Sequence, residues 1–199
     1  MVNDAESFFE RHIRLENDRI ILLPFSEQFE EGLSRIIYGD SELSRFSVNC
    51  RSESDLNAYI QRTVGEREKR NAYPFIVIDK TTNEVAGATR FGNIVFPNKR
   101  LEIGWTWYGK AYRGKGLNKA CKYELLKYAF EVMGFQRVQM SADIDNVQSQ
   151  RAIAKLGATK EGVFRNNYIN SAGESRDDVY YSIVASEWEY IKRTVFKGF

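Results

Sequence analysis

Hydrophobic positions along this chain recur with two periods, and these periods predict an alternation of strands and helices. Apolar runs typical of strands occupy residues 19–25, 74–79, 84–91, 101–108, 137–143, 159–165 and 177–184. Apolar residues at helical spacing mark residues 29–37, 56–64, 117–132, 147–156 and 188–195. Residues 1–10 show neither period, and we expect a frayed acidic arm there.

The order of these elements indicates the fold class. Strand hairpins come first, and a strand–helix–strand–helix–strand succession follows, which favours an α+β fold with a mixed sheet. Ser52 and Asp55 have the spacing of a helix-capping pair, and Gly134 lies where a C-cap glycine is expected. A chain of 199 residues is most simply one domain spanning residues 1–199.

The stretch 107–120 joins the predicted strand 101–108 to the predicted helix 117–132 through a loop with Gly114 and Gly116. Glycine lets a backbone approach an anion without a Cβ in the way, and unpaired N–H groups at a helix N-terminus attract negative charge. The loop matches neither GxGxxG nor GxxxxGK[ST]. The pattern predicts an anion site, although a basic surface turn would account for the same residues.

Arg113-x-x-Gly116 closes this loop on the helix. It resembles the signature Gln/Arg-x-x-Gly-x-Gly/Ala of the GNAT acetyltransferases, with Asn118 in place of the final Gly or Ala. The resemblance implies that the loop holds the pyrophosphate of acetyl-CoA. The cofactor-binding residues that it implies here are Trp107, Tyr108, Arg113, Gly114, Lys115, Gly116, Leu117 and Asn118.

A second segment, about 30 residues later, carries the same resemblance. Asn146-x-x-Ser149, followed by Lys155-Leu156-Gly157, is similar to the family segment whose asparagine binds pantetheine or its surroundings. The resemblance therefore adds Asn146 and Ser149 to the cofactor-binding residues, although an asparagine there would also suit a helix N-cap. Ile153 stands where many family members have a tyrosine that protonates the leaving thiolate, which leaves Ser149 or water for that role.

Further segments, 15–24, 101–105 and 162–165, resemble the RimJ/RimL subgroup of this family, and the likeness covers residues 15–187. It implies a three-layer α/β/α fold whose mixed, mostly antiparallel sheet splays at the parallel strand pair 101–108 and 137–143. It also implies an N-acetyltransferase that moves the acetyl group of acetyl-CoA to a primary amine. The acceptor would be a protein N-terminal α-amine, on a ribosomal or other protein, or a small amine.

Direct attack of an amine on a thioester requires a neutral amine and a stabilised oxyanion. Glu102 is the candidate base, because the resemblance places a catalytic or water-orienting glutamate near this position; a solvent-facing strand residue is the alternative. Strand alternation assigns Glu102 to the face opposite Trp105 and Trp107. The backbone N–H of Trp107 or Tyr108 is the candidate oxyanion donor.

The acceptor side is less defined by the sequence. Asp143 and Asp145 could attract a cationic amine, or they could be ordinary loop acids. We expect the segments 45–47, 55–68 and 166–175 to shape the acceptor site.

Composition limits the alternatives. The formal net charge of +2 is close to balance and offers no electrostatic case for nucleic acid or an anionic membrane as partner. His12 is the only histidine, and Cys50 and Cys121 lie far apart, so we expect neither a histidine-activated nucleophile nor a metal site. No apolar run reaches transmembrane length, and a cytoplasmic protein is expected; a homo-oligomer is compatible with the sequence.

Two other functions stay open on the sequence alone. A non-catalytic CoA-binding or regulatory domain on the same fold would explain why Ile153 replaces the tyrosine and why Asn118 departs from the signature. A nucleotide- or phosphate-binding module of another kind would use the same glycine loop.

Overall fold

The structure is a computed structural model that describes residues 5–45, 47–170 and 172–199. The strands are β1 (Leu15–Glu16), β2 (Ile20–Pro24), β3 (Tyr73–Asp79), β4 (Glu84–Val95), β5 (Arg100–Tyr108), β6 (Arg137–Asp143), β7 (Thr159–Ile169) and β8 (Ser175–Val184). The α-helices are α1 (Ala5–Glu10), α2 (Glu30–Gly39), α3 (Glu53–Glu68), α4 (Leu117–Lys127), α5 (Val147–Ala154) and α6 (Ala185–Thr194). Short helical turns are η1 (Glu27–Phe29), η2 (Ser41–Arg45), η3 (Lys110–Tyr112) and η4 (Tyr128–Val132), the last a π-turn that extends α4.

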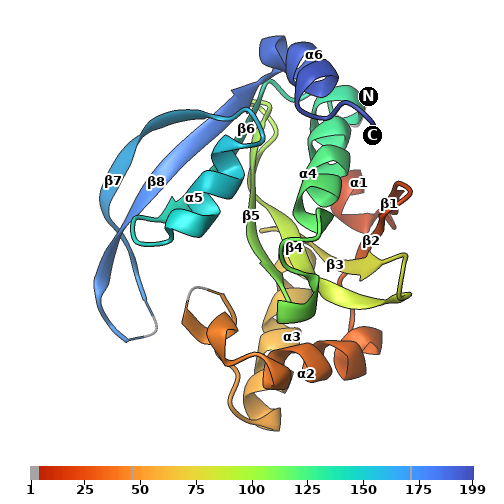
Figure 1. Cartoon of the computed structure of the whole chain (residues 1–199), viewed down its shortest axis with the longest axis vertical. Coiled ribbons are helices and arrows are strands. Elements are labelled where there is room, and N and C mark those ends of the chain that lie inside the picture. The colour runs from red at the N-terminus through yellow and green to blue at the C-terminus, as the bar shows by residue number, and fades with distance from the viewer. Residues whose placement is uncertain (1–4, 46, 171) are drawn as a thin grey trace.

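The strands of the described ranges form one eight-stranded sheet in the order β1-β2-β3-β4-β5-β6-β8-β7 (Figure 1). Neighbouring strands are antiparallel except β5 and β6, which run parallel. Residues 100–102 of β5 pair with residues 137–139 of β6, and beyond these pairs the two strands diverge. The predicted α+β fold, with a mixed sheet that splays at its parallel pair, is confirmed.

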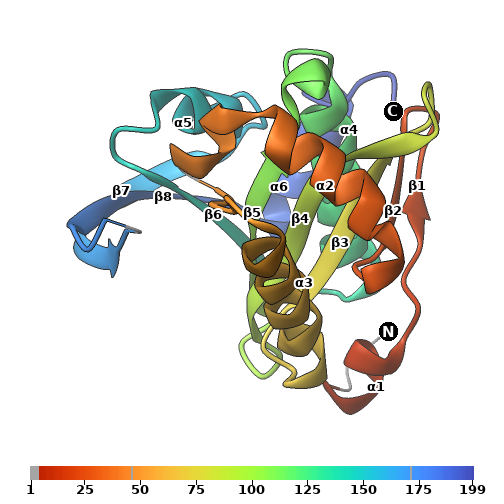
Figure 2. The same ribbon diagram turned by 90° about the horizontal axis from the view of Figure 1, so that it is seen from below.

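Helices cover both faces of this sheet (Figure 2). On one face α2 and α3 bury Leu33 and Leu56 in a cluster that includes Trp107 of β5. On the other face a larger cluster joins α1, α4, α5 and α6 to the sheet and includes Ile103 of β5. Because β5 contributes residues to both clusters, the part of β5 beyond its pairs with β6 is packed on both faces.

The central strand departs from strict alternation at Trp105. This residue has a φ of 50°, and the pairing register with β4 shifts beside it, which together mark a β-bulge. Ile103 therefore packs on the α4 face, whereas Trp107 packs on the α2–α3 face. The prediction that Glu102 lies opposite Trp105 and Trp107 is wrong, because the bulge reverses the alternation and puts all three on the α2–α3 face.

The N-terminal segment is also more ordered than predicted. α1 buries Phe8 and Phe9, and the Phe8 ring contacts the rings of Tyr73 and Phe96. Burial of two phenylalanine side chains contributes about 3–6 kcal/mol, which is enough to hold this short helix against the sheet. The expectation of a frayed arm is therefore wrong for residues 5–10, and residues 1–4 lie outside the described ranges.

Among the described residues, none of the helices combines the length and the hydrophobicity that a membrane crossing requires. Across the same ranges, no group of three or more His, Cys, Asp or Glu side chains is arranged to hold a metal ion.

Candidate functional site

The loop between β5 and α4 collects backbone donors at the open end of the splay. Gly114 and Gly116 have φ values of 73° and 84°, and α4 begins directly after them at Leu117. A Cβ built on either glycine would meet no atom within 4 Å, so the space in front of the loop is open. The N–H groups of the first helical turn have no partner inside the helix and carry the positive end of its dipole. The loop is therefore shaped to hold an anion.

The Arg113 side chain is bound to protein groups. Its Nε donates to the Tyr108 carbonyl at 2.9 Å, and its two Nη atoms contact Asp40 at 2.6 Å and Glu42 at 2.9 Å. These contacts tie the loop to η2 and to the end of β5. Arg113 thus fixes the shape of the loop, which leaves the backbone N–H groups and the exposed Lys115 as the groups that face solvent.

The end of β5 directs one backbone N–H into the splay. The Gly109 N–H donates to the Ala86 carbonyl of β4, while the Tyr108 carbonyl accepts from Arg113 on the other side. In a strand, the N–H and carbonyl of one residue point the same way and those of the next residue point the opposite way. Of the two predicted oxyanion donors, Tyr108 therefore directs its N–H toward the splay, and Trp107 directs its N–H toward β4.

Asn146 and Ser149 lie at the start of α5, across the splay from this loop. The Asn146 Oδ1 accepts from the Ser149 N–H at 3.1 Å, so the asparagine caps the helix. The cap uses the side-chain oxygen and leaves the Nδ2 group for another partner. Ile153 belongs to α5, and its side chain is buried in the hydrophobic core. An isoleucine has no phenol that could protonate a leaving thiolate.

Glu102 lies on β5 inside a cage of donors. The Asn93 and Gln139 amides donate to its Oε2 at 2.8 and 3.0 Å, and the Ser141 hydroxyl donates to Oε1 at 3.1 Å. The side chain is 4% exposed, which rules out the solvent-facing alternative. A carboxylate offers about four lone-pair sites, so the cage orients Glu102 and leaves one site for a further proton donor.

Asp143 and Asp145 are neutralised by Arg176. The guanidinium contacts the Asp143 carboxylate at 2.9 Å through Nε and Nη2 and also pairs with Asp145. The Arg176 contact, with a 2.6 Å hydrogen bond from Tyr168, holds the pKa of Asp143 at about 2. Neither acid is therefore free to attract an amine, and their role is to anchor the β7–β8 hairpin to β6.

The segments expected to shape the acceptor side contribute unequally. Helix α3 reaches the α2–α3 face of β5 through Glu66, which lines a cavity there. In the segment 166–175, Tyr168 donates to Asp143, which also pairs with Arg176, and Ser171 lies outside the described residues. Phe46, within the expected segment 45–47, lies outside the described residues.

The sequence did not identify the partners of Glu102. Gln139 and Ser141 alternate with the apolar residues of β6, which indicated a polar face but no partner for it. Asn93 lies beyond the strand predicted over residues 84–91, whereas in the structure it belongs to β4 and donates to Glu102. A search for polar residues on neighbouring strands would have found all three candidates.

Comparison with known proteins finds relatives of this chain. Residues 19–159 match the family of acetyltransferase (GNAT) domains. The chain is 35% identical over 106 residues to YdaF of Bacillus subtilis, a proposed ribosomal N-acetyltransferase. The aligned region spans 53% of this chain and 56% of YdaF. A proposed acetyltransferase structure from T. thermophilus is 33% identical, with a TM-score of 0.83 and coverage of 92% of this chain and 95% of the other. MccE, a microcin C7 self-immunity acetyltransferase solved with acetyl-CoA and AMP, is 25% identical, with a TM-score of 0.75 and coverage of 84% and 93%.

Proposed function

Because this chain belongs to the GNAT acetyltransferase family, we propose that it transfers the acetyl group of acetyl-CoA to a primary amine by direct attack. The observation that carries this proposal is the glycine loop at the N-terminus of α4, which follows β5; that strand carries Glu102 at its last pair with β6, where the splay begins. In the reaction, the amine nitrogen forms a bond to the acetyl carbon, the carbon–sulfur bond breaks, and the amine loses a proton while the thiolate gains one.

The cofactor side supplies backbone donors. The N–H groups of residues 114–119 and the helix dipole would hold the pyrophosphate of acetyl-CoA. The Nδ2 group of Asn146 would donate to an amide of the pantetheine arm. The Tyr108 N–H would donate to the carbonyl oxygen of the acetyl group as negative charge develops on it.

The proton transfers fall to side chains or to water. Glu102 would take the proton of the attacking amine, either directly or through one water, because its cage leaves one lone-pair site. Ser149, at the start of α5, or water would return a proton to the thiolate, since Ile153 leaves no phenol there. A thiol has a moderate pKa, so a thiolate can leave without a strong acid.

The acceptor is proposed to be a primary amine, either a protein N-terminal α-amine or a small amine. The name of YdaF supports a ribosomal protein as one such acceptor. The buried Ile153 favours a second candidate, a CoA-binding domain without transferase activity.

Release of free thiol from acetyl-CoA in the presence of peptides, polyamines and aminoglycosides tests both candidates. Amine-dependent release above the rate with acetyl-CoA alone is expected. Binding of CoA by calorimetry without release on any amine would replace the enzyme by the binding domain. Failure to bind CoA or acetyl-CoA at all would refute both.

A further inference from the structure

The guanidinium of Arg113 is fixed by directed hydrogen bonds from two separate parts of the chain. Its Nε donates to the Tyr108 carbonyl at the end of β5 at 2.9 Å. Its Nη2 donates to Asp40, directly after α2, at 2.6 Å, and its Nη1 donates to Glu42 of η2 at 2.9 Å. A planar guanidinium whose three nitrogens are all bonded cannot turn without breaking one of these bonds. The position of Arg113 is therefore set by its partners.

The two carboxylates that pair with Arg113 differ in burial. The Asp40 side chain is 3% exposed, whereas the Glu42 side chain is 69% exposed. A buried carboxylate that loses its cation is left as an uncompensated charge, which is strongly unfavourable. An exposed ion pair is screened by water and contributes little. The contact with Asp40 is therefore the one that keeps Arg113 in place.

Asp40 is itself held to the sheet without help from the glycine loop. Its Oδ1 accepts from the Glu42 N–H at 3.2 Å, and its carbonyl accepts from the Leu43 N–H at 3.2 Å. Leu43 and Val48 are buried in the α2–α3 cluster, which includes Trp107 of β5. The turn that follows α2 is thus a fixed point from which Asp40 holds Arg113.

The glycine loop has few side chains of its own to hold it. Gly114 and Gly116 follow Arg113 closely, and a Cβ on either would meet no atom within 4 Å. Glycine also has the widest backbone freedom of any residue. The conformation of this loop therefore depends on the anchors at its two ends, which are Arg113 and the start of α4 at Leu117.

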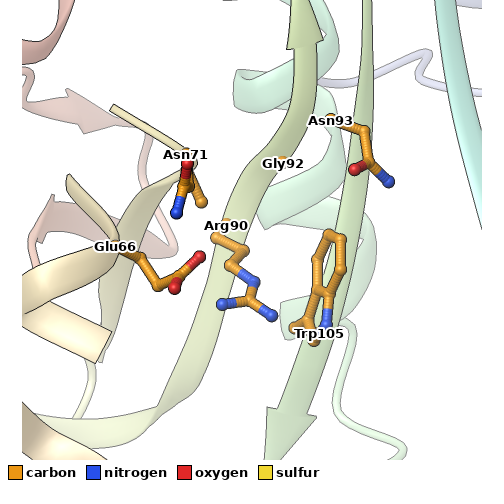
Figure 3. Close-up of a pocket in the computed structure, with 7 residues that line it drawn as sticks. Glu66, Asn71, Arg90, Gly92, Asn93 and Trp105 are labelled. Atoms are coloured by element: carbon orange, nitrogen blue, oxygen red, sulfur yellow. The ribbon is translucent and has the colours of Figure 1, made fainter. Parts of the chain in front are cut away.

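Arg90 provides a contrast within the same molecule. Its guanidinium lies 3.8 Å from the centre of the Trp105 ring, and its Nε has no hydrogen-bond partner among the described residues. Figure 3 shows this stacked pair, with Glu66 on the other side of the arginine. The fold thus holds Arg90 by stacking and Arg113 by three directed bonds. Directed bonds are the arrangement expected where the exact position of an arginine matters.

We propose that Asp40 is a positioning residue for acetyl-CoA: through Arg113 it holds the glycine loop in the conformation that receives the pyrophosphate. Arg113 acts as a brace for the loop and stays with Asp40 when the anion is bound. This inference rests on the proposed function and adds a residue to it that lies far from the loop in sequence. Without Asp40 only a fraction of the molecules keep the competent loop, and the apparent Kd rises as the inverse of that fraction.

Asp40→Asn removes the charge and keeps the shape, and calorimetry with CoA measures the result. We expect the Kd to rise about tenfold, which corresponds to a competent fraction of about one tenth. Glu42→Gln should raise it by less than about threefold, because that pair is exposed. Arg113→Gln should match Asp40→Asn, and the double variant should be no weaker than the weaker single variant, since both changes break the same contact.

Steady-state kinetics separates positioning from a general loss of stability. Bound acetyl-CoA restores the competent loop, so the KM for acetyl-CoA should rise with the Kd while kcat at saturation stays within about twofold. A merely structural role would lower the free energy of unfolding and leave the Kd of the folded protein unchanged. Asp40→Ser keeps an acceptor for the Glu42 N–H and repeats the test if Asp40→Asn does not fold.

Asp18→Asn, on the exposed turn between β1 and β2, is the matched control and should leave the Kd unchanged. An unchanged Kd in the Asp40 variants would overturn the inference and leave the proposed function intact. Tighter binding would overturn it as well, because Arg113 would then be an anion ligand that Asp40 withholds. CoA binding by the parent protein without thiol release on any amine would instead refute acetyl transfer and leave the role of Asp40 in binding to be decided by these Kd values.

Discussion

The two sides of the candidate site are built from different material. The candidate cofactor side is built mainly from consecutive backbone N–H groups that follow Gly114 and Gly116 at the start of α4. The candidate acceptor side consists of side chains contributed by β4, β5 and β6, which meet at Glu102. Backbone donors come with the chain conformation, whereas a side-chain cluster exists only if distant residues are all present. A single substitution should therefore affect the two sides in different ways.

The largest expected effect falls on the acceptor side. Glu102→Gln keeps the shape of the side chain and removes the base, so kcat should fall by about 10²–10⁴-fold. The KM for acetyl-CoA should change by less than about twofold, because the carboxylate lies on the acceptor side. Higher pH should restore part of the rate, since more of the amine is then neutral. Steady-state kinetics over a range of pH measures all three.

Glu174→Gln, on the exposed hairpin turn, is the control and should leave kcat unchanged. If Glu102→Gln keeps kcat within about twofold of the parent protein and the pH profile does not move, Glu102 is a structural carboxylate. The acceptor side would then contain no proton acceptor at Glu102, and the proton of the attacking amine would pass to water.

Lys122 links α4, which follows the glycine loop, to β5, which carries Glu102. It belongs to α4, is 4% exposed, and donates to the Thr106 hydroxyl beside the bulge at 2.7 Å. Burial lowers its pKa from 10.5 to about 8, a difference that corresponds to about 3 kcal/mol. Below pH 8 both folded and unfolded chains carry the proton and the full cost is present. Between pH 8 and 10.5 the unfolded chain binds more protons, so this cost declines as pH rises.

Lys122→Met should therefore raise the free energy of unfolding by up to about 3 kcal/mol at pH 7, and the gain should shrink toward pH 10. Denaturant unfolding of both proteins at each pH gives this difference. The neighbouring Tyr108 and Cys121, whose pKa values burial raises, titrate in both proteins and largely cancel. A difference that does not vary with pH would show that Lys122 is not held with a lowered pKa.

The cofactor side should respond to a Cβ on Gly116. At 100 times its Kd, acetyl-CoA should stabilise the parent protein by about 2.7 kcal/mol. Gly116→Val places a branched side chain in the open space that faces the anion, and we expect Kd to rise about tenfold. At the same acetyl-CoA concentration the stabilisation should then be about 1.4 kcal/mol. Thermal unfolding with and without acetyl-CoA measures both values.

The variant should also unfold at a lower temperature without ligand, since a φ of 84° costs a branched residue roughly 1–2 kcal/mol. Gly173→Val, at a φ of 82° in the hairpin turn, carries the same backbone cost away from the loop and is the control. Equal stabilisation of both variants by acetyl-CoA would mean that the glycine loop is an ordinary turn.

The contrast between the two sides also explains what the sequence could predict. Gly114, Gly116 and the start of α4 are neighbours in the chain, so their pattern could be recognised directly. Glu102 and its partner Gln139 are 37 positions apart, and no local pattern joins them. The bulge at Trp105 had no sequence signal either, because a positive φ at tryptophan is rare, and it reversed the predicted faces of β5.

The smallest expected effect distinguishes the two roles of Asn146. Asn146→Asp keeps the oxygen that accepts from the Ser149 N–H, and aspartate caps helices about as well as asparagine. The change removes the Nδ2 donor and adds a negative charge, so a hydrogen bond worth about 0.5–1.5 kcal/mol should be lost. We therefore expect the thermal stability without ligand to be unchanged and the Kd for acetyl-CoA to rise about three- to tenfold. Asn146→Ala should weaken binding similarly but also destabilise the protein by about 1 kcal/mol, because it removes the cap. If Asn146→Asp leaves the Kd unchanged by calorimetry, the asparagine is a helix cap alone, and the cofactor side consists only of backbone groups.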